Sequence, residues 1–276
     1  MGLLDVFRKP KRVTEENPTL ELPKQPAGLT LKVGNVQGIG LREGQEDSFA
    51  VLNAANAAEL SRQGLFAVVC DGMGGMEGGK AASEVAVEGL CQSFRAMEPE
   101  SDTAACLTDA IRTVSDQVFC QFSGRSGTTA VAVRIFDGEL HWLSVGDSAI
   151  FLYRDGGVFQ LNREHTYLNQ LYARELAEEV ICKERAEQDE DARRLTSFVG
   201  INCLEEIDVN FNPFPLKSGD VLLLCSDGIS GVLTPPELME AMRLDPGEGC
   251  LLLETLVLEK CVPEQDNYTG IMISCN

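Results

Sequence analysis

From residue 29 onward the chain alternates short apolar runs with turn signals, and this pattern constrains the fold most strongly. Val, Ile, Phe and Thr enrich the runs, as is typical of β-strands. Helical spacing of apolar residues predicts two long helices at 78–98 and 101–122 and a shorter pair at 235–243 and 247–260. Antiparallel strands with segregated helices predict an α+β layered domain. The predicted strands are 30–36, 48–53, 65–70, 128–136, 139–146, 149–154, 206–211, 220–225 and 268–274.

The length of 276 residues is near the upper limit for a single hydrophobic core. We expect a flexible leader at 1–28, which carries four prolines, and one domain at 29–276. Apolar residues followed by basic ones at 3–12 leave open a weak docking element instead of a frayed tail. The charged segment 162–200 has a helical pattern and predicts an insertion over one end of the core. A surface helix without function is the alternative for that segment.

The formal net charge of −20 argues against binding to nucleic acid or to anionic membranes. Such acidity suits clustered carboxylates that hold divalent cations, although solubility alone explains it as well. The ten cysteines form no C-x-x-C pair, and several lie in apolar runs. No apolar run approaches the roughly 18 residues of a membrane span. These features predict a cytoplasmic protein without stable membrane insertion.

Aspartates recur at the ends of the predicted strands. Asp71 follows the run LFAVVC, Asp147 follows HWLSVG and Asp227 follows VLLLCS. Asp47 begins a strand, and Asp266 precedes the last one. An aspartate at a strand end can direct its carboxylate into a cleft at the rim of a sheet, and Mg²⁺ or Mn²⁺ prefers such oxygen ligands. The set therefore indicates a site for two metal ions, whereas each Asp-Gly alone is typical of a turn.

Two neighbouring features support this interpretation. The run DGMGGMEGG, which begins at Asp71, implies a close backbone approach or several positive φ angles. A phosphate cradle without metal would also need glycine, but the Walker lysine and Ser/Thr are missing. Arg42 lies five residues before Asp47, where a guanidinium can clamp phosphate oxygens in a fork. A surface pair between Arg42 and Glu46 is the alternative.

Taken together, these segments resemble the metal-dependent (type 2C, PPM) serine/threonine protein phosphatases of bacterial type. The resemblance covers roughly 30–276, and its strength lies in the order of the pieces. They are REGQEDS at 42–48, VVCDGMGG at 68–75, SGTTA at 126–130, SVGDS at 144–148, EHT at 164–166, LTSFVG at 195–200, LCSDGIS at 224–230 and DNYT at 266–269.

The resemblance implies a central antiparallel β-sandwich flanked by helix pairs, a four-layer α-β-β-α arrangement, with a helical flap at about 162–200. It implies that Arg42 holds the substrate phosphate and that Glu46 orients a metal-bound water. It also implies two Mg²⁺ or Mn²⁺ ions that bridge a water, whose hydroxide attacks the phosphorus of phosphoserine or phosphothreonine. The implied metal ligands are Asp47, Asp71, the Gly72 carbonyl, Asp227 and Asp266, with Asp147 at a third metal site.

Three positions depart from the pattern. Met73 stands where some members carry a histidine that serves as a candidate acid for the leaving group. Gly231 stands where many have an aspartate that helps to hold a third metal, so we expect that site to be weak or absent. Ala149 replaces a frequent arginine. His165 either donates a proton or anchors the flap by hydrogen bonds, and the second role is the one we expect.

The leading prediction is a hydrolase of signalling, a serine/threonine protein phosphatase that acts on phosphorylated proteins. Because members of this class often oppose a serine/threonine kinase, the resemblance implies such a kinase and its targets as partners. We expect a monomer. The alternative is a catalytically weak phosphatase fold that acts as a regulatory docking module, which Gly231 favours and the intact aspartates oppose. A metal-dependent nuclease conflicts with the net charge of −20.

Overall fold

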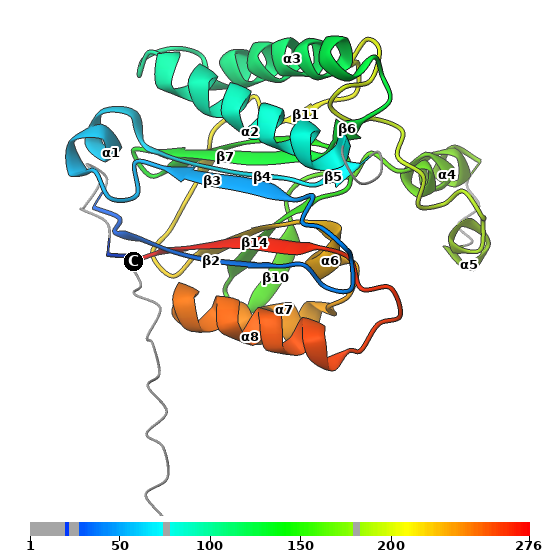
Figure 1. Cartoon of the computed structure of the whole chain (residues 1–276). Coiled ribbons are helices and arrows are strands. Elements are labelled where there is room, and N and C mark those ends of the chain that lie inside the picture. Colours follow the sequence, from blue (N-terminus) through cyan, green and yellow to red (C-terminus); the bar gives the residue numbers. More distant parts are fainter. Residues whose placement is uncertain (1–19, 22–27, 74–77, 179–182) are drawn as a thin grey trace, which may run out of the picture.

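Two antiparallel β-sheets form the centre of the molecule (Figure 1). The computed structural model describes residues 20–21, 28–73, 78–178 and 183–276. The first sheet, in the order β1-β2-β14-β13-β9-β10, contains β1 (Leu20–Glu21), β2 (Leu31–Gly38), β14 (Tyr268–Cys275), β13 (Val221–Cys225), β9 (Ala149–Arg154) and β10 (Gly157–Gln160). The second, in the order β11-β8-β7-β4-β3, contains β11 (Asp208–Val209), β8 (Glu139–Val145), β7 (Ala130–Phe136), β4 (Leu65–Cys70) and β3 (Ser48–Leu52), with β12 (Phe214–Pro215) also on β8.

Helices cover the outer faces of both sheets. In Figure 1, α2 (Gly78–Ala96) and α3 (Thr103–Phe122) lie over the second sheet. On the first sheet lie α7 (Pro235–Met242) and α8 (Pro246–Glu259). All four helices begin and end within two residues of the predicted bounds. Mixed α/β content with antiparallel sheets is therefore confirmed.

The remaining elements are short. They are α1 (Ala57–Gln63), α4 (Tyr167–Ala177), α5 (Lys183–Glu187), α6 (Asp227–Ser230), β5 (Gly72–Met73) and β6 (Gly127–Thr128). Figure 1 shows α4 and α5, both from the predicted flap, beside the end of the sheets at which β5 and β6 also lie. No helix of the described residues is both long and apolar enough to cross a membrane.

Strand periodicity places the cores. Along β4, Phe66, Val68 and Cys70 pack with α2 and α3, whereas Leu65, Ala67 and Val69 pack between the sheets. Successive side chains of a strand point to opposite faces, so a run that is apolar throughout predicts a strand covered on both sides. The first sheet behaves alike, since Leu222 and Leu224 of β13 face the second sheet while Leu223 packs against α7 and α8. Apolar side chains thus fill the space between the sheets and the space under each helix pair.

Antiparallel pairing brings the aspartate-bearing strand ends together. β3 begins where β4 ends, because Ser48 lies opposite Cys70. In the other sheet β14 begins where β13 ends, with Cys225 opposite Gly270. Asp147 lies in the connection from β8 of one sheet to β9 of the other. One end of the molecule therefore carries every strand end that the sequence analysis singled out.

Some elements were not expected. In the predicted leader the structure describes β1, whose Leu20 pairs with Val33 of β2, and most of the remaining leader lies outside the described residues. β10 forms a hairpin with β9 through Asp155 and Gly156, which both have positive φ (52° and 82°). Part of the run DGMGGMEGG, residues 74–77, also lies outside the described residues.

Candidate metal centre and phosphate site

A cavity of about 380 Å³ opens between the converging strand ends. Residues from both sheets, from the loop before β3 and from the predicted flap line it. They are Arg42, Glu46, Asp71, Gly72, Met73, Thr129, Asp147, Arg193, Leu195, Asp227, Asp266 and Asn267. The structure thus brings Arg42, Glu46, Asp71, Gly72, Asp147, Asp227 and Asp266 into one cavity, as the sequence analysis expected.

Asp47, the residue after Glu46, is completely buried and is not among the residues that line this cavity. Ser226 Oγ donates a hydrogen bond to its Oδ2 at 2.9 Å, and Ser226 precedes Asp227 in the other sheet. The carboxyls of Asp71 and Asp227 lie within hydrogen-bonding reach of each other. Acid groups from the two sheets therefore meet at a single point.

Burial keeps these carboxyls from ionising easily. It raises the pKa of Asp47 to about 6, and the neighbouring charge of Asp227 adds to the effect. The pKa of Asp147 rises to about 7, again through burial first and then through Asp227 and Glu164. Burial and the adjacent carboxylates also raise the pKa of Asp71 and Asp227. A positive charge at the centre of such a cluster would favour the ionised carboxylates and lower these pKa values.

Three buried carboxylate oxygens have no hydrogen-bond donor within the described residues: Glu46 Oε1, Asp47 Oδ1 and Asp227 Oδ1. A buried acceptor without a donor is costly unless a cation or a water satisfies it. Hard divalent cations bind such oxygens, so the donor set fits Mg²⁺ or Mn²⁺. Among the described residues, no three His, Cys, Asp or Glu side chains are placed so that they could hold a metal ion by themselves.

Arg42 stands at the exposed side of the cavity, with 55% of its side chain accessible. Its Nη2 donates to Asp266 Oδ2 at 2.6 Å, and this bond raises the pKa of the guanidinium. The alternative pairing of Arg42 with Glu46 is therefore not the one observed. The ion pair holds a phosphate-binding cation beside the carboxylate cluster and ties the loop before β3 to the loop before β14.

Hydrogen bonds from Asn267 and Lys80 fix the loops around the acids. Asn267 Oδ1 accepts from the Glu46 N–H at 2.7 Å, and its Nδ2 donates to the carbonyls of Ile39 and Gly44. Lys80 Nζ donates to the Asp47 carbonyl at 2.9 Å. Neither Asn267 nor Lys80 was predicted as a site residue, although Asn267 belongs to the DNYT motif.

At Gly72 and Gly228, backbone atoms of another segment lie so close that no side chain would fit. A Cβ on Gly72 would come within 2.2 Å of the Gly79 carbonyl oxygen and within 2.7 Å of the Glu46 carbonyl. A Cβ on Gly228 would lie 1.9 Å from the Asn267 carbonyl. Both sites need glycine because backbone from another element occupies the space of a side chain. The expectation of close approach in the run after Asp71 thus applies to Gly72.

The flap contributes residues that sequence analysis did not select. Arg193 lines this cavity and an adjoining one of about 330 Å³, which Asp147, Glu164 and Gly231 also line. Glu164 lies in the quoted EHT motif, whereas nothing in the local sequence marks Arg193. The cavity of the carboxylates is thus lined by a second arginine besides Arg42.

His165 anchors the flap. Its N–H donates to the Gly146 carbonyl at 2.8 Å, its carbonyl accepts from Thr196 N–H at 2.8 Å, and its Nδ1 accepts from Gly146 N–H at 3.1 Å. Burial lowers the pKa of the imidazole. His165 lines neither the main cavity nor the adjoining one, which agrees with the expected anchoring role.

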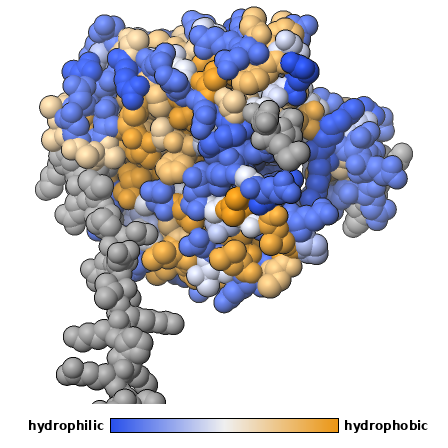
Figure 2. Space-filling view, viewed as in Figure 1, coloured by the Kyte–Doolittle hydropathy of each residue, from blue (hydrophilic) through white to orange (hydrophobic). Residues whose placement is uncertain are grey.

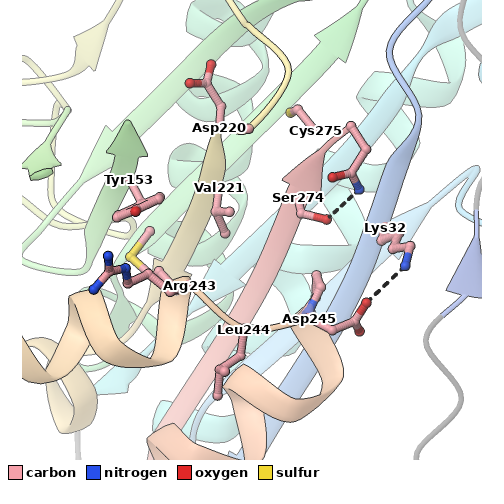
Figure 3. A pocket seen from close by; sticks show the side chains of 13 residues that line it. Lys32, Tyr153, Asp220, Val221, Arg243, Leu244, Asp245, Ser274 and Cys275 are labelled. Atoms are coloured by element: carbon pink, nitrogen blue, oxygen red, sulfur yellow. Dashed lines mark hydrogen bonds and ion pairs between the residues drawn. The ribbon is translucent and has the colours of Figure 1, made fainter. Parts of the chain in front are cut away.

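A pocket of about 410 Å³ lies at the opposite end of the first sheet (Figure 3). Asp220, just before β13, lines it, whereas Asp227 follows the same strand at the other end. Its charges are largely matched, because Lys32 Nζ pairs with Asp245 at 3.0 Å and Asp220 pairs with Arg154 at 2.6 Å. Neither its position nor its charge connects this pocket to the carboxylate cluster.

Sequence comparison identifies relatives with known classifications. The family model described as protein phosphatase 2C matches residues 45–246. The serine/threonine phosphatase stp of Listeria innocua is 28% identical over 184 residues, which cover 64% of this chain and 71% of that protein. Protein phosphatase PhpP of Streptococcus pneumoniae is 28% identical over 186 residues, with 64% and 72% covered.

Solved structures agree in fold. The serine/threonine phosphatase PstP/Ppp of Mycobacterium tuberculosis superposes with a TM-score of 0.73 at 25% identity, covering 88% of this chain and 98% of that one. The catalytic domain of PstP in complex with two manganese ions superposes with a TM-score of 0.71 at 25% identity, with 90% and 99% covered.

The paired sheets and their carboxylate cluster define a metal-dependent phosphatase of the PPM fold. The chain belongs to the protein phosphatase 2C family, whose model matches more than half of its residues. The predicted class of enzyme is thereby confirmed, and the alternative of a catalytically weak fold that acts as a regulatory docking module is not favoured.

Proposed function

We propose that this chain hydrolyses phosphoserine and phosphothreonine in proteins, with divalent cations held by the carboxylate cluster. The proposed protein ligands are Asp47, Asp71, the Gly72 carbonyl, Asp227 and Asp266. The observation that carries the proposal is the group of buried carboxylate oxygens without donors beside an exposed guanidinium. Such an arrangement attracts cations to one wall of the cavity and phosphate oxygens to the other.

Each polar group then has a distinct task. Bound divalent cations would supply Lewis-acid charge and lower the pKa of a water. Arg42, which is 55% exposed, can bind two phosphoryl oxygens in a fork while it keeps or exchanges its contact with Asp266. Glu46, whose backbone is fixed by Asn267, offers the unpaired Oε1 as an acceptor for the attacking water. The departing serine or threonine oxygen takes its proton from water, since Met73 cannot donate one.

We propose two bound ions, Mg²⁺ or Mn²⁺, with a third site that is weak or absent. PstP with two manganese ions supports the number two. Asp147 lines the cavity, but Gly231 beside it offers no carboxylate. The two flanking helix pairs support the finer description of a four-layer α-β-β-α sandwich formed by one domain at 29–276. A monomer in the cytoplasm that opposes a serine/threonine kinase completes the proposal.

Phosphate release from a phosphothreonine peptide tests the function, with Mn²⁺, with Mg²⁺ and with EDTA. We expect turnover with metal and none with EDTA. A folded protein that binds Mn²⁺ in calorimetry but releases no phosphate under any condition would contradict the proposal and support the docking alternative.

A further inference from the structure

The second sheet ends in an open strand beside the carboxylate cluster. β3 is the last strand of that sheet, and within the described residues it pairs with β4 alone. Figure 1 shows β3 at the front of the molecule, between α2 and the first sheet. An unpaired strand edge presents free N–H and C=O groups to another chain unless something covers it. No charged residue interrupts the strand SFAVL.

The register shows which backbone groups face outward. The N–H of Asp71 donates to Thr129 Oγ1 at 3.0 Å and its carbonyl accepts from Thr129 N–H at 2.8 Å, so Asp71 directs its backbone toward β7. Successive residues of a strand direct their backbone N–H and C=O groups to opposite sides. The N–H and C=O groups of Cys70 therefore face Ser48 of β3. The residues Ser48, Ala50 and Leu52 then bond to β4. Phe49 and Val51 present their N–H and C=O groups to the open edge.

A groove of about 540 Å³ runs along this edge, between β3 and α2. Ala50 and Leu52 line it from the strand, and Val87 lines it from the helix. All three are only partly buried, and Figure 2 shows apolar surface on this face at the position that β3 has in Figure 1. The charges at the groove are mixed, with Glu84 and Arg95 both on its lining. Main-chain pairing and apolar contact, not charge, would hold an occupant there.

The groove is linked to the candidate catalytic cavity by lining residues that it shares with a cavity between them. It shares Lys80 with a neighbouring cavity of about 730 Å³, which also contains Arg42 and Glu46. Arg42 and Glu46 in turn line the carboxylate cavity. Asp47 is the residue immediately before β3, so the strand leads directly away from the cluster.

We propose that the polypeptide flanking the phosphorylated residue binds as an additional β-strand along β3. This inference rests on the proposed phosphatase function and names how its substrate is held. The five residues of β3 offer about 17 Å of strand, enough for about five residues on one side of the phosphoresidue. Backbone hydrogen bonds to Phe49 and Val51 would give affinity with little sequence preference. The occupant is therefore an extended, unfolded segment of a phosphoprotein, and folded phosphosites are poor substrates.

Peptide length provides the first test, because it leaves the enzyme unchanged. Phosphothreonine peptides are extended by up to six residues on either the amino or the carboxyl side, and hydrolysis of p-nitrophenyl phosphate serves as the reference. We expect KM to fall about tenfold for extension on one side only, as one or two net main-chain hydrogen bonds would produce. In the favoured series, N-methylation of alternate peptide bonds should raise KM with a period of two residues.

A substitution on α2 provides the second test. Val87→Lys places a long charged side chain in the groove, and Val85→Lys on the same helix is its matched control. Both valines are partly buried against the same core, but only Val87 lines the groove. We expect Val87→Lys to raise KM for the long peptide about tenfold without changing hydrolysis of p-nitrophenyl phosphate. The control should change neither.

The outcomes separate the two proposals. Absence of metal-dependent turnover with every substrate would overturn the function itself. Normal hydrolysis of p-nitrophenyl phosphate and short peptides, with no effect of peptide length or with N-methyl effects that do not alternate, would overturn strand addition alone. Equal losses in the Val87 and Val85 variants would also count against it, because they would trace to the helix and not to the groove.

Discussion

Replacing Asp147 by asparagine should stabilise the metal-free protein at alkaline pH. Burial and the charges of Asp227 and Glu164 raise the pKa of Asp147 from 3.8 to about 7. A carboxyl with a higher pKa in the folded than in the unfolded state binds its proton more tightly when folded. Its contribution to the free energy of unfolding therefore falls as pH rises from about 4 to 7 and is fully unfavourable above 7. Asparagine stays neutral and avoids this cost.

The size of the effect follows from the same values. The difference between 3.8 and about 7 corresponds to roughly 4 kcal/mol, at 1.36 kcal/mol for each pH unit. Asp147 is only partly buried, so solvent screening reduces the expected gain to about 2 kcal/mol. For a domain of this size that gain raises Tm by about 4–8 °C. At pH 5 the gain should fall to less than half of its alkaline value.

Thermal unfolding in EDTA at pH 8 and pH 5 measures the prediction. Asp137→Asn is the control, since Asp137 is an exposed turn residue with a positive φ of 51°, which asparagine tolerates. We expect the Asp147 variant alone to gain stability, and Mn²⁺ to stabilise the wild type more than the variant. An unchanged or lower Tm at pH 8, or a gain equal at both pH values, would refute the argument that burial and neighbouring charges make ionised Asp147 unfavourable.

Three further predictions concern the site and the core. Asp227→Asn should reduce metal-dependent phosphate release by at least about a hundredfold while circular dichroism stays unchanged, and retained activity would exclude Asp227 as a ligand. Arg42→Ala should raise KM for a phosphopeptide about tenfold or more, with the Mn²⁺ affinity from calorimetry changed far less; equal losses in both would argue for a structural role. Phe94 is fully buried and stacks on Phe66 with 4.8 Å between the ring centroids. Phe94→Ala should therefore lower the free energy of unfolding, measured in urea, by about 3–5 kcal/mol, and a loss below about 1 kcal/mol would contradict its place in the core.

Local sequence predicted the elements whose pattern is long and regular. The runs 65–70 and 220–225 correspond to β4 and β13 because each must fill two cores at once. β10 was missed although its signal is present, since Asp155-Gly156 is typical of a two-residue hairpin turn. The seven residues of α1 carry too few apolar positions to show helical periodicity, and their helix depends on the cap from Asn56.

Strand ends and the order of the motifs were enough to predict which aspartates form the site. Antiparallel pairing of β3 with β4 brings Asp47 next to Asp71, and the packing of the two sheets brings Asp227 to them, as expected. The partner of Arg42 was not, because Asp266 lies 224 residues away in the sequence. Arg193 has no local signal, since only the path of the flap brings it to the cavity. Contacts made by loops across such separations are not encoded in the spacing of nearby residues.

The location of the carboxylates explains why the site depends on the packing between the sheets. Asp47 and Asp71 lie next to strands of one sheet, and Asp227 and Asp266 lie next to strands of the other. The two pairs are far apart along the chain, so the buried apolar layer between the sheets sets the distance between them. Hydrogen bonds across that layer, such as Ser226 to Asp47, fix the final geometry. The four carboxylates are few among the 43 acidic residues, so the net charge of −20 is mainly a property of the remaining acids and not of the site.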